Sequence, residues 1–261
     1  MGLGVPPAAY DRATTIFSPE GDLYQVRYAF KAVEKGWTSL GARGADSVVI
    51  AAEKRLISTL LDIEDIEKIY KVDDHIGVAF AGMGSDGRVL ISQAQIIAVR
   101  HRLLYGEIPS VDYIARMIAD IKQAYTQHAG VRPFGVSLIF GGVNPDGRVR
   151  LLKTDPGGQY FSYYAVAIGM GESHALEVFR EEYKKNMTFE ELVRLVLKAL
   201  FKARIETAMS EEESKKEELL KNFHELVELG YVKKDEMMFK KMSKKELKEY
   251  VEKFYDDLLK V

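Results

Sequence analysis

The chain has 261 residues, of which 47% are hydrophobic, so it can bury a sizeable core in one large or two small domains. Its formal net charge of −2 argues against a nucleic-acid partner or an anionic membrane surface, because both require a concentrated basic face. Cysteine is absent, which excludes disulfides, cysteine-ligated metals and thiol nucleophiles.

The N-terminal segment, residues 1–12, contains two adjacent prolines and little periodicity, which predicts a mobile or conditionally ordered tail. It lacks a basic segment followed by an apolar run, and no apolar stretch approaches ~18 residues, so we expect neither a signal peptide nor a membrane span. Residues 18–21 predict a reverse turn. Asp22 is expected to cap a helix over 23–34, and Gly36 to end it.

The periodicity after this helix predicts groups of strands that alternate with pairs of helices. Connections between the early strands are too short for helical crossovers, so these strands should pair in antiparallel fashion. The predicted elements are, in chain order, strands 38–42, 48–52, 66–72 and 76–81; helices 86–104 and 111–127; strands 134–141, 148–154 and 160–167; helices 172–185 and 188–206; strands 227–232 and 238–242; and a helix 244–259.

This order predicts a single α+β domain over residues 13–261. The expected fold is a four-layer αββα sandwich, in which two antiparallel sheets pack together and helices cover both outer faces. Thr188 should cap one helix with Glu191 as its capping-box partner, and Ser243 should cap the last helix. The densely charged segment 205–225 is expected to be an insertion, either a solvated helix or a mobile loop.

Two glycine-rich segments resemble nucleotide-binding loops. Residues 82–87 match G-x-G-x-x-G between a strand and a helix, a pattern that can place a pyrophosphate on a helix N-terminus. The preceding strands pair as hairpins, so a tight turn is the favoured interpretation, and a nucleotide-binding enzyme remains an alternative. Residues 142–147 are followed by Arg148 and Val149, which lack the lysine and hydroxyl group of a phosphate loop, and this favours a hairpin turn.

Other patterns give no catalytic or metal centre. Gly135-Val136-Ser137 lacks the second glycine of a nucleophile elbow. The aromatic residues of 160–164 are expected to alternate in burial along a strand rather than to stack on bases. No metal or cofactor is therefore predicted, since the five histidines show no ligand spacing. They are His75, His101, His128, His174 and His224.

A series of motifs resembles one family along nearly the whole chain, least clearly at 205–225. The motifs are Ala9-Tyr10-Asp11-Arg12-Ala13, Phe17-Ser18-Pro19-Glu20-Gly21, Gln25-Val26-x-Tyr28-Ala29, Ala32-Val33-x-Lys35-Gly36, Ile66-Glu67-Lys68-Ile69, Asp86-x-Arg88, Tyr125-Thr126-Gln127, 131–139 and Asp155-Pro156-x-Gly158. In these positions the chain is similar to α-type subunits of the archaeal proteasome core. The resemblance implies the αββα fold of the N-terminal-nucleophile hydrolases.

The resemblance also implies that this chain is not itself a protease. The sister β subunits expose a catalytic threonine when a Gly–Thr bond is cut, and the matching junction here is Gly36-Trp37, which has no hydroxyl group. Thr38 follows but has no free amine within the chain. A catalytic hydrolase whose mature chain begins at Thr38 or another nucleophile remains an alternative. Three residues fall near active-site positions of β subunits: Glu53, Arg55 and Lys68.

The implied role is assembly and gating in the cytoplasm. The α subunits would form a homoheptameric ring that stacks on a ring of β subunits and admits unfolded protein substrates. The residues that match gate positions are Tyr10, Asp11, Arg12, Pro19 and Tyr28.

Pockets between α subunits are implied to bind ATPase activators through C-terminal tails that end hydrophobic–tyrosine–any residue. Lys68 matches the lysine that meets the tail's terminal carboxylate, and Gly36 and Met83 match other pocket positions. Taken alone, Lys68 would be interpreted as a solvated surface lysine. The chain departs from the family's Val-Glu-Tyr-Ala-Arg, because Arg27 and Phe30 replace the glutamate and the arginine. This puts the usual gate and pocket electrostatics in doubt, and no role is assigned to either residue.

Overall fold

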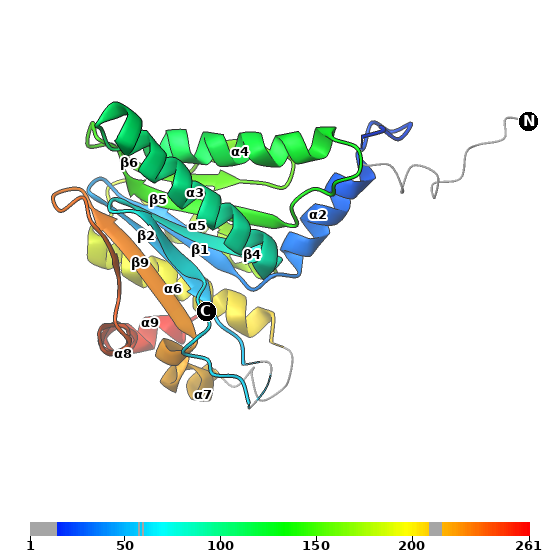
Figure 1. Cartoon of the computed structure of the whole chain (residues 1–261). Coiled ribbons are helices and arrows are strands. Elements are labelled where there is room, and N and C mark those ends of the chain that lie inside the picture. The colour runs from blue at the N-terminus through cyan, green and yellow to red at the C-terminus, as the bar shows by residue number, and fades with distance from the viewer. Residues whose placement is uncertain (1–14, 57, 59, 209–215) are drawn as a thin grey trace, which may run out of the picture.

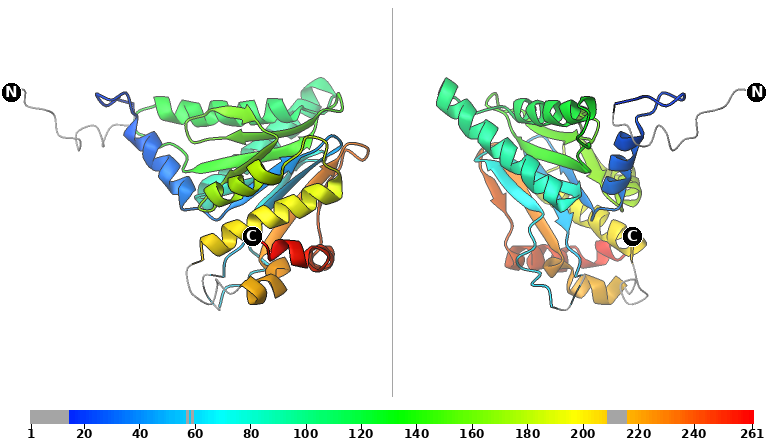
Figure 2. Two further views of the ribbon diagram at one scale, coloured as in Figure 1. Left: turned by 180° about the vertical axis from the view of Figure 1, so that it is seen from behind. Right: turned by 45° about the vertical axis from the view of Figure 1, so that its right-hand side comes forward.

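The computed structural model describes residues 15–56, 58, 60–208 and 216–261. Two five-stranded antiparallel sheets pack face to face (Figure 1), one in the order β10-β9-β2-β1-β8 and the other in the order β3-β4-β5-β6-β7. Helices α3 and α4 cover the second sheet, and α5 and α6 cover the first (Figure 2). The predicted αββα sandwich is confirmed. No helix in the described ranges is long and apolar enough to cross a membrane.

The elements follow the predicted order closely. The strands are β1 (Ser39–Arg43), β2 (Ser47–Glu53), β3 (Ile69–Asp73), β4 (Ile76–Gly82), β5 (Val136–Val143), β6 (Val149–Thr154), β7 (Tyr160–Ser162), β8 (Ala165–Ile168), β9 (Val227–Lys233) and β10 (Phe239–Lys241). The helices are α2 (Tyr24–Glu34), α3 (Gly84–Tyr105), α4 (Val111–Gln127), α5 (Glu172–Glu182), α6 (Phe189–Glu206), α7 (Lys216–Lys221), the short 3-10 turn η1 (Phe223–Glu225), α8 (Lys244–Lys253) and α9 (Tyr255–Leu258).

The central strands are buried on both faces because each sheet lies between its partner sheet and a helical layer. Every residue of β2 and of β5 is buried. Apolar side chains form three clusters, one between the sheets and one between each sheet and its helices. Strands with no solvent-facing side therefore read as continuous apolar runs, as in 48–52.

Helix caps agree with the sequence at two of three predicted positions. Thr188 and Ser243 both form capping boxes, and the Thr188 nitrogen donates to Glu191 Oε2 over 2.7 Å. The predicted cap at Asp22 is wrong. Helix α2 begins after Leu23, which makes no side-chain cap, and the Asp22 carboxylate instead accepts from Arg27 Nη1 at 3.2 Å.

The predicted strand 160–167 is in fact two strands in different sheets. β7 forms the edge of one sheet and β8 the edge of the other, so the chain crosses between sheets at Tyr163 and Tyr164. All three residues of β7 are exposed, which corrects the expected alternation of burial. An edge strand of three residues has no outer neighbour to cover its side chains.

Three predicted helices differ from expectation in length or burial. The helix predicted to reach 185 ends at Glu182, and the closing helix is interrupted between α8 and α9. Within the predicted insertion, α7 is a helix but is not fully solvated, because Leu219 and Leu220 are buried against the cluster that contains α6. Residues 209–215 of that prediction lie outside the described residues.

The topology excludes the dinucleotide-binding arrangement at residues 82–87. β4 leads through this turn into α3 and α4, and the next strand, β5, pairs with β4 in antiparallel fashion rather than parallel. The pyrophosphate-binding fold requires a parallel strand after its helix. The predicted hairpin turn joins β5 to β6 over residues 144–148, with Gly147 at a φ of 79°, and Gly142 and Val143 are the last paired residues of β5.

Candidate functional site

A pocket of about 280 Å³ lies at the end of the sandwich where α2 leads into β1. Two residues predicted from the resemblance, Gly36 and Lys68, line it together. Met83, the third, lies between two lining glycines and is 42% exposed. The lining residues are Lys35, Gly36, Trp37, Ile66, Glu67, Lys68, Phe80, Gly82 and Gly84.

Gly36 is required here by close approach of two backbone segments. A Cβ atom on Gly36 would lie 2.1 Å from the backbone nitrogen of Gly82, far inside van der Waals contact. Gly82 itself adopts a φ of 115°, which side chains rarely tolerate. The link from α2 to β1 can therefore pass against the turn from β4 to α3 only because both positions lack side chains, and this contact forms one wall of the pocket.

Lys68 supplies a buried amine to the pocket. The residue is only 4% exposed, which corrects the interpretation of a solvated surface lysine. Its Nζ donates to the Trp37 carbonyl oxygen at 3.4 Å and lies 4.2 Å from the centroid of the Phe80 ring. Burial lowers the pKa of Lys68 to about 8, although the charges of Glu53 and Glu228 oppose this shift. A desolvated ammonium of this kind can bind a carboxylate strongly.

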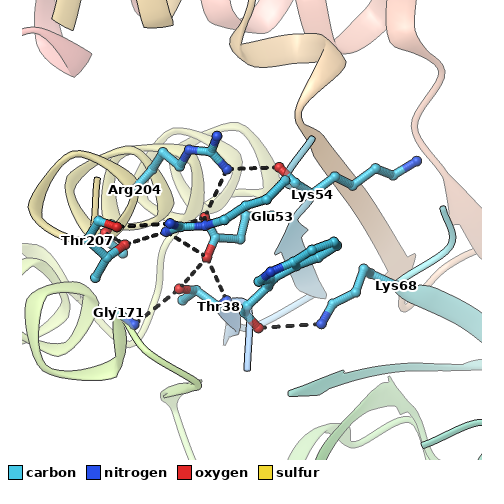
Figure 3. Close-up of polar contacts among 10 residues, drawn as sticks. Thr38, Glu53, Lys54, Lys68, Gly171, Arg204 and Thr207 are labelled. Atoms are coloured by element: carbon cyan, nitrogen blue, oxygen red, sulfur yellow. Dashed lines mark hydrogen bonds and ion pairs between the residues drawn. The ribbon is translucent and has the colours of Figure 1, made fainter. Parts of the chain in front are cut away.

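A buried polar cluster around Glu53 lies behind the pocket (Figure 3). The Thr38 backbone nitrogen and hydroxyl donate to Glu53 Oε1 at 2.8 and 2.9 Å. On the other carboxylate oxygen, Arg55 Nε and Arg204 Nη1 donate at 3.3 and 3.4 Å. Arg55 continues to Thr207 on the far side of the cluster, with Nη1 2.9 Å from the carbonyl oxygen. The three residues that donate to Glu53 are all buried, so the charge of its carboxylate is compensated inside the protein.

The same cluster constrains Thr38. Its hydroxyl donates to Glu53 and accepts from the Gly171 backbone nitrogen at 3.2 Å. Its own nitrogen is a peptide nitrogen within the segment that joins α2 to β1, so it offers no free amine to activate a hydroxyl nucleophile. This geometry opposes the alternative of a catalytic Thr38.

The sequence did not reveal Arg204 or Glu228 as part of this region. Arg204 lies 151 positions from Glu53. Glu228 accepts hydrogen bonds from the backbone at Lys68 across 160 positions. Neither residue belongs to a motif, because each contact is created by the packing of distant elements. The signal in the sequence that could have indicated these two residues is the position of a charged residue within a mostly apolar helix or strand.

The predicted gate residues are only partly described. Tyr10, Asp11 and Arg12 lie outside the described residues. Pro19 is exposed in the predicted turn, which closes with the Gly21 nitrogen donating to the Ser18 carbonyl oxygen at 2.9 Å. Tyr28 is 42% exposed on α2. Figure 2 shows α2 at one end of the sandwich, on the side where the described chain begins.

The histidines do not form a metal centre within the described ranges, where no group of three or more histidine, aspartate or glutamate ligands occurs. His75, for example, uses its Nε2 to contact the Pro109 carbonyl oxygen at 2.7 Å.

Comparisons with known proteins give a consistent result. The family model described as "Proteasome subunit" matches residues 33–215, and the model of the N-terminal signature of A-type proteasome subunits matches residues 10–32. The proteasome α subunit of Aeropyrum pernix is 57% identical over 263 residues, which cover 100% of both chains. The proteins of the same name from Saccharolobus solfataricus and Sulfolobus acidocaldarius are 47% and 46% identical over 253 residues, or 97% of this chain and 100% of theirs.

Proposed function

The chain belongs to the proteasome subunit family and is of the non-catalytic α type, and from this premise we propose that it builds and gates the outer ring of a proteasome core. In this proposal, a homoheptameric α ring stacks on β subunits in the cytoplasm and admits unfolded protein to their proteolytic chamber. The observation that carries the docking part of the proposal is the pocket in which Gly36 and the buried Lys68 meet.

Proteolysis is assigned to the β subunits. The position that matches their nucleophile is Trp37, whose indole has no nucleophilic oxygen. The neighbouring hydroxyl, on Thr38, is held between Glu53 and Gly171. Both features support a structural and gating role for this chain within a threonine-protease complex.

The ring proposal is tested by the native mass of the chain expressed alone. We expect a mass near that of a heptamer of 29.5 kDa chains, or of two stacked heptamers. If the chain remains a monomer even when β subunits are supplied, the ring proposal is wrong.

The gate is assigned to residues 1–12, a tail that includes Tyr10, Asp11 and Arg12 and would cross or leave the central pore. Asp11 and Arg12 would pair across neighbouring copies, and Pro19 would anchor the turn from which the tail departs. Exposed ion pairs contribute only ~0–1 kcal/mol each, which suits a gate that must open. Deleting residues 2–12 should accelerate hydrolysis of peptides by the assembled particle, while titration of the β active sites shows their number unchanged. Equal rates with and without the tail would contradict gating.

Docking of ATPase activators is assigned to the pocket, where Lys68 would bind the terminal carboxylate of a hydrophobic–tyrosine–any tail and Gly36 and Met83 would shape its walls. A synthetic tail peptide should bind the assembled ring, and Lys68→Met should weaken binding by about tenfold or more. Lys71→Met is the matched control, because Lys71 lies on β3, three residues after Lys68, but its side chain is 54% exposed. A peptide with an amidated C-terminus should bind the unchanged ring as weakly as the free-carboxylate peptide binds the Lys68→Met ring. Equal binding of both peptides would exclude recognition of the carboxylate.

A further inference from the structure

Glu228 joins the two sheets directly behind the pocket. It lies on β9, whereas Lys68 immediately precedes β3 in the opposite sheet. One of its carboxylate oxygens, Oε2, accepts from the backbone nitrogens of Lys68 and Ile69 at 3.1 and 2.9 Å. β3 is an edge strand and Lys68 lies just before its first paired residue, Ile69. The carboxylate therefore supplies the acceptor that a neighbouring strand would otherwise provide.

Lys54 fixes the other oxygen of Glu228. Its Nζ lies 2.8 Å from Glu228 Oε1, and the two side chains are only 8% and 14% exposed. The backbone of Lys54 is held in turn, because its nitrogen donates to the Leu226 carbonyl oxygen at 2.7 Å and its carbonyl oxygen accepts from Arg204 Nη1 at 2.9 Å. Oε1 of Glu228 is thus held by Lys54, whose own position is set by the β2 and β9 region, and Oε2 is left to hold the backbone at Lys68 and Ile69.

We propose that Glu228, held by Lys54, is a positioning residue that fixes the backbone at Lys68 and so directs the Lys68 amine into the pocket. This inference rests on the proposed docking function. Residues 61–68 include no helix or strand. Without an external anchor, the backbone that carries Lys68 would have few constraints, and a ligand would lose binding energy in ordering it.

The charge of Glu228 gives this residue a second, separable effect. Glu228 and Glu53 both favour the charged form of Lys68, against the burial that disfavours it. Removing the charge of Glu228 should therefore lower the pKa of Lys68 further, and removing the whole side chain should also release the backbone.

Glu228→Gln separates these effects because an amide oxygen can still accept from both backbone nitrogens, while the charge is lost. Glu228→Ala removes both the acceptor for the backbone nitrogens and the negative charge. Both changes are also made in a Lys54→Met background, because the new amide would otherwise place an NH2 donor against the Lys54 ammonium and leave that ammonium unpaired. The control is Glu236→Gln, an exchange at the turn that follows the same strand.

Two measurements are made on the assembled full-length ring between pH 6.5 and 9. One is the affinity of a synthetic tail peptide with a free carboxylate, and the other is the rate of Lys68 acetylation, followed by peptide mass spectrometry. We expect Glu228→Gln to bind the peptide within about twofold of the unchanged ring at pH 6.5. As the pH rises, its affinity should start to fall at a lower pH than that of the unchanged ring, because its Lys68 loses the proton sooner. Glu228→Ala should bind about tenfold more weakly even at pH 6.5. Glu236→Gln should match the unchanged ring.

The outcomes distinguish the two proposals. If no ring binds the peptide but Glu228→Ala changes the rate of Lys68 acetylation beyond the pH shift that Glu228→Gln produces, the docking function is wrong and the positioning of Lys68 stands. If the peptide binds and depends on Lys68, while both Glu228 variants match the unchanged ring in affinity and acetylation, the positioning proposal is wrong.

Discussion

Lys68 and Lys122 are both buried, but the surroundings of their amines differ. Lys122 lies on α4 and is fully enclosed. Its Nζ donates to the Val136 carbonyl oxygen at 3.0 Å, the Thr154 carbonyl oxygen at 3.3 Å and the Thr154 hydroxyl at 2.9 Å. Lys68 has one longer hydrogen bond, to the Trp37 carbonyl oxygen at 3.4 Å, among the described residues and faces an open pocket.

The comparison shows why a perturbed pKa is not by itself a sign of function. Burial lowers the pKa of Lys122 to about 7 and that of Lys68 to about 8. The three acceptors around Lys122 use all the donors of an ammonium group, so its amine ties α4 to β5 and β6 and has no capacity for a ligand. The amine of Lys68 retains donors that a ligand can use, and its neighbouring charges, Glu53 and Glu228, lie behind it.

The largest expected effect on stability is at Glu53, in the cluster behind the pocket. Glu53→Ala should lower the free energy of unfolding by ~3–5 kcal/mol, because Arg55 and Arg204 would keep buried charges without their carboxylate. Denaturant unfolding of the assembled ring measures this loss, and Glu236→Ala is the exposed control. A loss below ~1 kcal/mol would mean that the cluster behind the pocket is not a structural unit.

The next effect separates the two lysines. Lys122→Met should lower the free energy of unfolding by ~1–3 kcal/mol, because buried acceptors on Val136 and Thr154 would lose their donor, and it should leave binding of the tail peptide unchanged. Thermal unfolding and peptide binding are measured together, with Lys248→Met as an exposed helical control. Loss of peptide binding at unchanged stability would reverse the roles assigned to the two lysines.

The pH dependence of stability sharpens the same contrast. The folded pKa of Lys122, about 7, lies below the value of 10.5 for an unperturbed lysine, so the unfolded chain binds more protons between these values. Its contribution to stability should therefore grow as pH rises and be lost as pH falls through about 7. The stability difference between the unchanged protein and Lys122→Met should widen by roughly 2–3 kcal/mol from pH 8 to 10. A difference independent of pH would show that Lys122 stays charged when folded.

The smallest expected effect concerns the ligand. With a pKa of about 8, Lys68 is mostly charged at pH 7 and mostly neutral at pH 9. Because a carboxylate binds only the charged amine well, affinity for the tail peptide should fall by up to about tenfold over this interval, or ~1.4 kcal/mol. Titrations at fixed ionic strength measure it, and the Lys68→Met ring should show no such fall. An unchanged affinity at pH 9 would mean that the Lys68 charge does not contribute.

Local features of the fold were predictable because they depend on near neighbours in the chain. The alternation of strands and helices, the hairpins and the capping box at Thr188 follow from periodicity and turn chemistry. The crossing of the chain between sheets at 163–164 did not follow, because a short apolar run carries no information on which sheet it joins. The prediction that Asp22 caps the first helix failed because the helix starts one residue later than expected, and a side chain can cap only the helix that begins directly after it.

By itself, the sequence determined the order of elements, the lack of a hydroxyl group at Trp37 and, through its motifs, the pairing of Gly36 with Lys68 at one site. Only the tertiary structure decided that Lys68 is desolvated rather than exposed, and that Arg204 and Glu228 reach the region behind it. These contacts join residues more than 150 positions apart. Such distances are closed by the packing of two sheets and their helices, and the electrostatic environment of a side chain depends on every element that meets there.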